Sequence, residues 1–127
     1  MAHPIAGLVL DHVQIAMPVG GEANARAFFG DLLGLTELPK PNAMAKRGGC
    51  WFAAGIHQLH LGVEDDFRPA KKAHVALASD DLDTLRATLD NAGYVTQTDT
   101  VIAGRSRFFT YDPFGNRIEF MDRVARA

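Results

Sequence analysis

The sequence has little of what several large classes of protein require. It contains a single cysteine, Cys50, which excludes an internal disulfide and any metal site built from several cysteines. It has no run of like charges, and its net charge of -2 argues against nucleic acid or an anionic membrane surface as the main partner. No stretch approaches the roughly 18 apolar residues of a membrane helix, and the N-terminus lacks the pattern of a signal peptide. We therefore expect a cytoplasmic protein that binds neither nucleic acid nor membrane.

The composition that remains is that of an ordinary globular domain. Hydrophobic residues make up 47% of the chain and charged residues 22%. A length of 127 residues supports one core and is short for two separate domains. We therefore treat residues 1–127 as a single domain.

The chain repeats itself. Asp-His-Val-Gln-Ile-Ala at 11–16 matches Ala-His-Val-Ala-Leu-Ala at 73–78, and Gly-Ile-His-Gln-Leu-His-Leu at 55–61 resembles Gly-Asn-Arg-Ile-Glu-Phe at 115–120. Each half, about 8–64 and about 73–122, reads as strand, helix, strand, strand, strand. The sequence thus predicts two tandem modules of the same architecture.

Hydrophobic periodicity and turn residues set the expected elements. Alternation of apolar and polar residues predicts strands, and apolar residues at helical spacing, such as Ala25, Phe28, Phe29 and Leu32, predict helices. Polar segments with glycine predict loops at 39–49 and 98–105. The expected strands are 8–17, 35–39, 50–54, 57–63, 73–78, 94–97, 107–111 and 116–121, and the expected helices are 22–33 and 80–92.

The repeat turns four separate side chains into two equivalent pairs. His12 matches His74 in the first strand of each half, and His60 matches Glu119 in the last strand. All four lie on the polar faces of their strands, so two halves related by a pseudo-twofold axis can bring them to one point. Imidazole and carboxylate groups suit Zn, Ni, Co, Mn or Fe(II). The pattern therefore predicts a divalent metal site, in which His60 is the least secure ligand because Gln58 shares its face.

A turn followed by a strand determines which residue enters that site. Asp112, Pro113, Gly115 and Asn116 are turn formers, and the strand after them alternates apolar and polar residues. A slip of one residue would exchange the two faces. The turn is therefore expected to fix the register that directs Glu119 toward the site.

These features together resemble the vicinal oxygen chelate superfamily, which groups glyoxalase I, bleomycin-resistance proteins, fosfomycin-resistance proteins, methylmalonyl-CoA epimerase and extradiol dioxygenases. The resemblance spans about residues 8–122. It rests on Leu-Asp-His-Val-Gln-Ile at 10–15, Ala-Phe-Phe-Gly-Asp-Leu-Leu-Gly-Leu at 27–35, Ala-His-Val-Ala-Leu at 73–77, and Asp-Pro-Phe-Gly-Asn-Arg-Ile-Glu-Phe at 112–120. It implies an α+β fold in which two tandem βαβββ modules form a cupped mixed sheet around a divalent metal. His12, His74 and Glu119 match the ligand positions, and His60 fills the remaining one.

The resemblance does not select one reaction. Glyoxalase I typically has Glu at the position of His60, epimerases tend to have Gln there, and extradiol dioxygenases and fosfomycin-modifying enzymes use two His and one Glu. The expected activity is therefore isomerisation or lyase chemistry, or ring-cleaving dioxygenation, on a small substrate that chelates the metal through adjacent oxygens. The alternative is a bleomycin-resistance-like protein that binds a small molecule without catalysis, although drug-binding members lack the ligands.

Roles for the neighbouring residues follow from the shared faces. The resemblance implies that a carboxylate beside the metal moves the substrate proton, so Glu119 is the expected general base as well as a ligand. Gln14, Gln58 and Arg117 share the polar faces and are the expected substrate contacts. Arg107 lies beside a predicted loop, where solvated charge is the default expectation. A homodimer is implied by the resemblance, because relatives commonly pair two chains.

Overall fold

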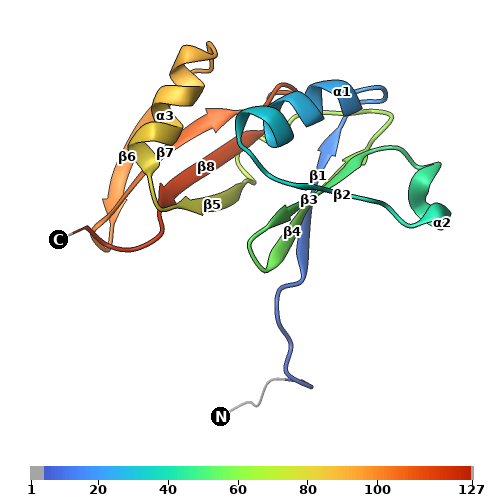
Figure 1. Ribbon diagram of the computed structural model, residues 1–127, viewed down its shortest axis with the longest axis horizontal. Coiled ribbons are helices and arrows are strands. Elements are labelled where there is room, and N and C mark those ends of the chain that lie inside the picture. Colours follow the sequence, from blue (N-terminus) through green and yellow to red (C-terminus); the bar gives the residue numbers. More distant parts are fainter. Residues whose placement is uncertain (1–4, 127) are drawn as a thin grey trace.

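Two four-stranded mixed sheets of the same topology make up the fold (Figure 1). The structure is a computed structural model and describes residues 5–126. The first half contains β1 (His12–Met17), α1 (Glu22–Ala25), η1 (Arg26–Leu32), β2 (Glu37–Leu38), α2 (Asn42–Ala45), β3 (Cys50–Ala54) and β4 (His57–Val63). The second half contains β5 (Val75–Ser79), α3 (Leu82–Asn91), β6 (Gln97–Ile102), β7 (Arg105–Tyr111) and β8 (Arg117–Asp122).

Strand pairing confirms the predicted repeat. The strand orders are β1-β4-β3-β2 and β5-β8-β7-β6, and in each sheet the first strand runs parallel to the last. The register also recurs, because Gln14 lies opposite His60 in one sheet and Ala76 lies opposite Glu119 in the other. His60 and Glu119 therefore occupy equivalent places, and the predicted tandem α+β fold is confirmed.

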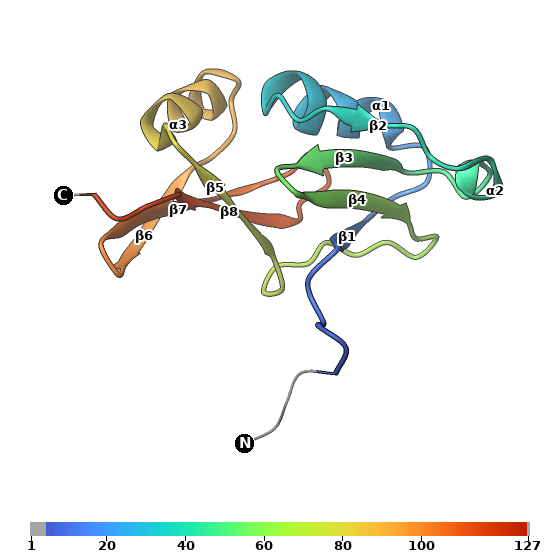
Figure 2. The same cartoon turned by 60° about the horizontal axis from the view of Figure 1, so that its bottom comes forward.

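One hydrophobic core joins the two halves. The helices α1 and α3 lie on the same side of their sheets (Figure 2), and the buried cluster includes Phe28 from the first half and Leu89, Phe108 and Ile118 from the second. The Phe28 ring packs against Tyr94, with ring centres 4.9 Å apart. Both halves therefore contribute to one core. Within residues 5–126, no helix is long and apolar enough to cross a membrane.

Several predicted boundaries are wrong for local physical reasons. Residues 8–11 lie outside β1 and run away from the body of the fold (Figure 1), with Leu8 84% exposed. The segment expected as one α-helix over 22–33 continues as the π-helix η1, in which the Leu33 amide donates to the Phe28 carbonyl five residues back. The loop expected over 39–49 contains the short helix α2.

The largest error concerns β6. A strand was expected at 94–97 and a loop at 98–105, but β6 covers Gln97–Ile102 and pairs with β7. Ala103 and Gly104 adopt positive φ and form a two-residue turn between these strands. The polar residues of this segment predicted a loop in its place. Tyr94 instead packs on Phe28. As a consequence β7 begins at Arg105, two residues earlier than predicted.

The turn before β8 connects the two halves through buried hydrogen bonds. Asp112 is 4% exposed, and its Oδ1 accepts from the amides of Phe114 and Asn116 at 2.9 and 2.8 Å. The Asn116 Nδ2 donates to Asp112 Oδ2 at 3.0 Å and to the Ala16 carbonyl in β1 at 2.8 Å. Asn116 thereby fixes the start of β8 relative to the first half of the chain. Burial raises the pKa of Asp112, and the hydrogen bonds from Asn116 and neighbouring amides oppose that rise.

Candidate metal centre

His74 and Glu119 form a close pair in the second half of the chain. His74 directly precedes β5, and Glu119 lies in the neighbouring parallel strand β8. The His74 Nε2 is 2.9 Å from the Glu119 Oε1, and the Glu119 side chain is only 9% exposed. The fold therefore brings these two predicted ligands together on one face of the second sheet.

The hydrogen bonding of His74 leaves this pair in need of a positive charge. The His74 Nδ1 lies 2.8 Å from the Lys72 carbonyl, which can only accept, so Nδ1 carries a proton. In the neutral ring, Nε2 then presents a lone pair to a carboxylate oxygen, and two acceptors face each other. A proton between the two atoms or a bound cation resolves this contact.

The spacing of the pair fits a divalent metal ion. Two neighbouring ligands of an octahedral ion, each at about 2.1 Å, lie about 3.0 Å apart. The observed distance between Nε2 and Oε1 is 2.9 Å. A backbone carbonyl on the other ring nitrogen is the usual arrangement of a metal-bound histidine. The donor set and its geometry therefore suit the metal that the sequence predicts.

Arg107 contacts the same carboxylate, contrary to the expectation of a solvated loop charge. β7 includes this residue, and its guanidinium Nη1 lies 3.5 Å from the Glu119 Oε2. The Arg107 Nη2 lies 3.4 Å from the Asp99 Oδ1, and its Nε donates to the Thr100 carbonyl at 2.8 Å. Arg107 thus holds Glu119 in place. The contact follows from the pairing of β7 with β8, which places Arg107 diagonally across from Glu119, and the pattern within one segment does not show that pairing.

His12 and His60 form the corresponding pair in the first half, but as stacked rings. Their centres are 4.3 Å apart with planes at 18°, and Trp51 stacks on the other side of His60 at 4.1 Å and 5°. The His60 Nε2 donates to the Gln58 Oε1 at 2.8 Å. Burial, and then the nearby His12, lower the pKa of His60, so this ring is neutral near neutral pH.

The stack limits how many ligands the first half can supply. An imidazole nitrogen binds a metal along its lone pair, which lies in the ring plane. Two nearly parallel rings 4.3 Å apart cannot both direct a lone pair at one ion unless one ring turns. His12 is the better placed, because its Nδ1 donates to the Asp11 carboxylate at 2.8 Å and leaves Nε2 free. In this arrangement His12 is the candidate ligand of the first half, and His60 is not directed at the same point.

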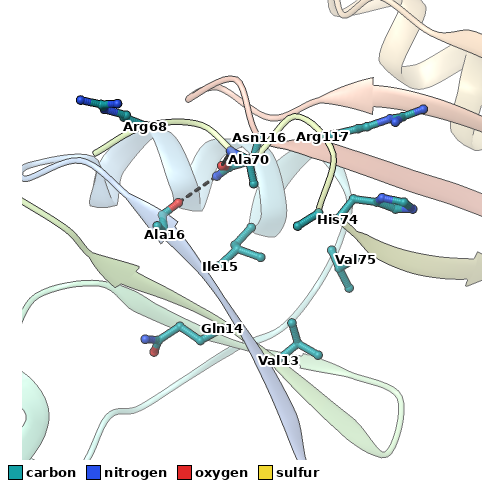
Figure 3. Close-up of a pocket in the computed structure, with 11 residues that line it drawn as sticks. Val13, Gln14, Ile15, Ala16, Arg68, Ala70, His74, Val75, Asn116 and Arg117 are labelled. Atoms are coloured by element: carbon teal, nitrogen blue, oxygen red, sulfur yellow. Dashed lines mark hydrogen bonds between the residues drawn. The ribbon is translucent and has the colours of Figure 1, made fainter. Parts of the chain in front are cut away.

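The two pairs do not meet within one chain. Among residues 5–126, no three His, Cys, Asp or Glu side chains come close enough to share an ion. A cleft lined by Val13, Ile15 and Val75 separates β1 from β5, and in Figure 3 Gln14 points away from His74 and Arg117. His3, which has no partner in the repeat, lies outside the described residues. One chain therefore presents two candidate half-sites, each on its own sheet.

Comparison with known proteins identifies the family. The family model described as the Glyoxalase/Bleomycin resistance protein/Dioxygenase superfamily matches residues 9–120. The chain therefore belongs to this superfamily. Among curated proteins, no sequence matches significantly.

Solved structures agree with this assignment. A glyoxalase family protein from Bacillus anthracis is 46% identical, with a TM-score of 0.88, over 98% of this chain and 100% of the other. A glyoxalase/dioxygenase from Nostoc punctiforme is 22% identical, with a TM-score of 0.73, over 96% and 97% of the two chains. The fosfomycin resistance protein FosX from Listeria monocytogenes is 14% identical, with a TM-score of 0.67, over 95% and 96%. The last two show a shared fold only.

Proposed function

We propose that the protein is a metal-dependent enzyme that acts on a small substrate carrying two adjacent oxygens. The observation that carries this proposal is the contact between His74 Nε2 and Glu119 Oε1 at 2.9 Å, with the His74 Nδ1 proton already committed to a carbonyl. We propose His12, His74 and Glu119 as the ligands. His60 would then support His12 as its stacked neighbour. The ion belongs to the group Zn, Ni, Co, Mn or Fe(II), which this donor set suits.

The residues around this centre have separate tasks in the proposed reaction. The ion acts, when bound, as a Lewis acid that polarises the two substrate oxygens. Glu119 is the described carboxylate in contact with His74, so it is also the proposed proton acceptor. Gln14 and Gln58 lie on the face of the first sheet that carries His12 and His60, and we propose them as hydrogen-bonding contacts for the substrate. Three protein ligands leave room for a chelating substrate in both isomerase or lyase and dioxygenase chemistry.

We propose further that two chains complete each site as a homodimer. The half-sites lie on separate sheets, and β1 and β5 each form the edge of their sheet. The segment before β1 runs out from the fold and exposes Leu8, Val9 and Leu10 by 84, 81 and 59% (Figure 2). Such a run of exposed apolar residues favours contact with another chain. In this arrangement His12 of one chain meets the His74–Glu119 pair of a second copy.

A metal titration tests the proposed function. Protein stripped with EDTA should bind one divalent ion per chain in calorimetry, with a competing chromophoric chelator for the tightest ions. Sedimentation should show a dimer in the same samples. The proposal is wrong if no ion binds at submillimolar concentration. In that case, binding of an apolar small molecule that is indifferent to EDTA would support the non-catalytic binding protein instead.

A further inference from the structure

Arg117 is a half-buried arginine whose hydrogen-bonding groups are unused. Its guanidinium carbon lies 3.7 Å above the centre of the Phe109 ring. Its Nε is buried and is, within residues 5–126, the one buried side-chain nitrogen or oxygen without a hydrogen-bond partner. Unpaired buried polar groups are rare in native proteins and commonly mark a place where a ligand, ion or water belongs.

The other arginines of the described chain differ from Arg117 in this respect. Some donate to protein oxygens or form ion pairs, and the rest lie exposed to solvent. The first group is Arg26, Arg86, Arg105, Arg107, Arg123 and Arg126, and the second is Arg47 and Arg68. Arg117 alone combines partial burial with free donors in the part of the chain that the structure describes.

Arg117 lies close to the His74–Glu119 half-site. It precedes Glu119 by two residues in β8, so both side chains project from the same face with Cα atoms about 6.6 Å apart. The His74 ring packs on the same Phe109 side chain, with ring centres 5.3 Å apart. Because both groups lie against one ring, the guanidinium and the imidazole are no more than about 9 Å apart. Figure 3 shows both side chains pointing to the same side.

The carboxylates on this face pair with Arg107 and not with Arg117. Asp99 and Glu119 both lie within 3.5 Å of Arg107. No carboxylate of the described residues forms an ion pair with Arg117. Stacking on Phe109 holds the guanidinium in a fixed plane, which reduces the entropy lost when it binds an anion. A planar guanidinium with free N–H groups matches a carboxylate or a phosphate group.

We infer that Arg117 binds an anionic group of the substrate. The substrate class is then a small acid that chelates the metal through two adjacent oxygens and carries a carboxylate or phosphate-type group within about 9 Å of them. This inference rests on the proposed metal site. It adds a specificity residue, fixed by Phe109, to a centre that otherwise recognises only the chelating oxygens.

A binding series on the zinc-loaded protein tests this inference, since zinc is redox-inert. The probes are catechol, 3,4-dihydroxybenzoate and 3,4-dihydroxyphenylacetate, which share one chelating pair of oxygens. At least one carboxylated probe should bind about tenfold or more tightly than catechol, as expected for a charged hydrogen-bonded pair. Arg117→Gln should abolish that preference and leave catechol affinity unchanged, and Arg117→Lys should keep part of it. Arg123→Gln removes an exposed charge and should change nothing.

The outcomes separate this inference from the proposed function. A carboxylate preference that survives Arg117→Gln, or no preference in the wild type, overturns the role of Arg117. Catechol binding that does not require zinc overturns the proposed metal site itself. If Arg117→Gln does not fold, competition experiments on the wild-type protein test the same inference. Inorganic phosphate should compete with the carboxylated probes for binding and should not compete with catechol. Equal competition against both contradicts the inference.

Discussion

Replacing Glu119 with glutamine is expected to lower the affinity for a divalent ion by about 100-fold or more. Glutamine has nearly the same shape, so the change removes the charge and leaves the packing of this 9%-exposed side chain in place. Loss of groups that merely support a metal ligand costs about 10–100-fold in affinity, and Glu119 is the only anionic ligand proposed. Calorimetric titration of the stripped variant measures the effect.

The control for this variant is Glu64→Gln, which removes an exposed carboxylate elsewhere. Its ion affinity should equal that of the wild type. Arg107 retains Asp99 as a partner in Glu119→Gln, so circular dichroism should show an unchanged fold. An affinity within about threefold of the wild type would mean that Glu119 does not bind the ion, because loss of even a supporting group costs more.

Replacing Asn116 with alanine is expected to destabilise the protein by about 3–5 kcal/mol, because several buried groups lose their partners together. The Asn116 side chain donates to Asp112 and to the Ala16 carbonyl, and its Oδ1 accepts from the Ala70 amide at 3.0 Å. Asn116 is itself only 2% exposed. Urea unfolding of the metal-free protein measures the loss.

The cost of Asn116→Ala should also depend on pH. Burial raises the pKa of Asp112, so its contribution to stability is full below the unfolded value, about 3.9, and falls as pH rises through the folded value. Removing the Asn116 hydrogen bonds raises that pKa further. The destabilisation should therefore be larger at pH 7 than at pH 4. Asn91→Ala, at an exposed site on α3, is the control, and equal losses for the two variants would contradict this account.

Local patterns were sufficient to predict most of the fold. β3 and β4 begin and end where alternation and the Gly55 turn place them. The repeat correctly paired His60 with Glu119, because the two residues hold equivalent register positions in their sheets. The Asp112–Asn116 turn also predicted the face on which Glu119 lies. These features depend on residues that are close in sequence and on the alternation of apolar and polar residues. Both can be read from a single sequence.

Features that depend on distant contacts could not be predicted. The Arg107–Glu119 contact needs the pairing of β7 with β8, and the Arg107–Asp99 contact needs the pairing of β6 with β7, where a polar segment with Thr, Asp and Gly predicted a loop. The stack of Trp51, His60 and His12 follows from the packing of three strands. A repeat also defines equivalent positions within each half, but it does not specify whether the two halves that share a metal come from one chain. The structure separates the half-sites, and that separation is what suggests a second chain.

The central claim, a metal site shared between two chains, is tested most directly by mixing two variants that each fail to bind the ion tightly. Expressed alone, the His12→Ala chain and the Glu119→Gln chain should each lack high-affinity ion sites. The two chains, each with a different tag, are then co-expressed. In a mixed dimer, one site combines both substitutions and the other combines two intact halves. Random pairing should therefore restore about a quarter of wild-type ion capacity in calorimetry. His74→Ala mixed with Glu119→Gln is the matched control and should restore none, because both changes fall in the same half-site. No recovery with His12→Ala and Glu119→Gln would contradict the shared site.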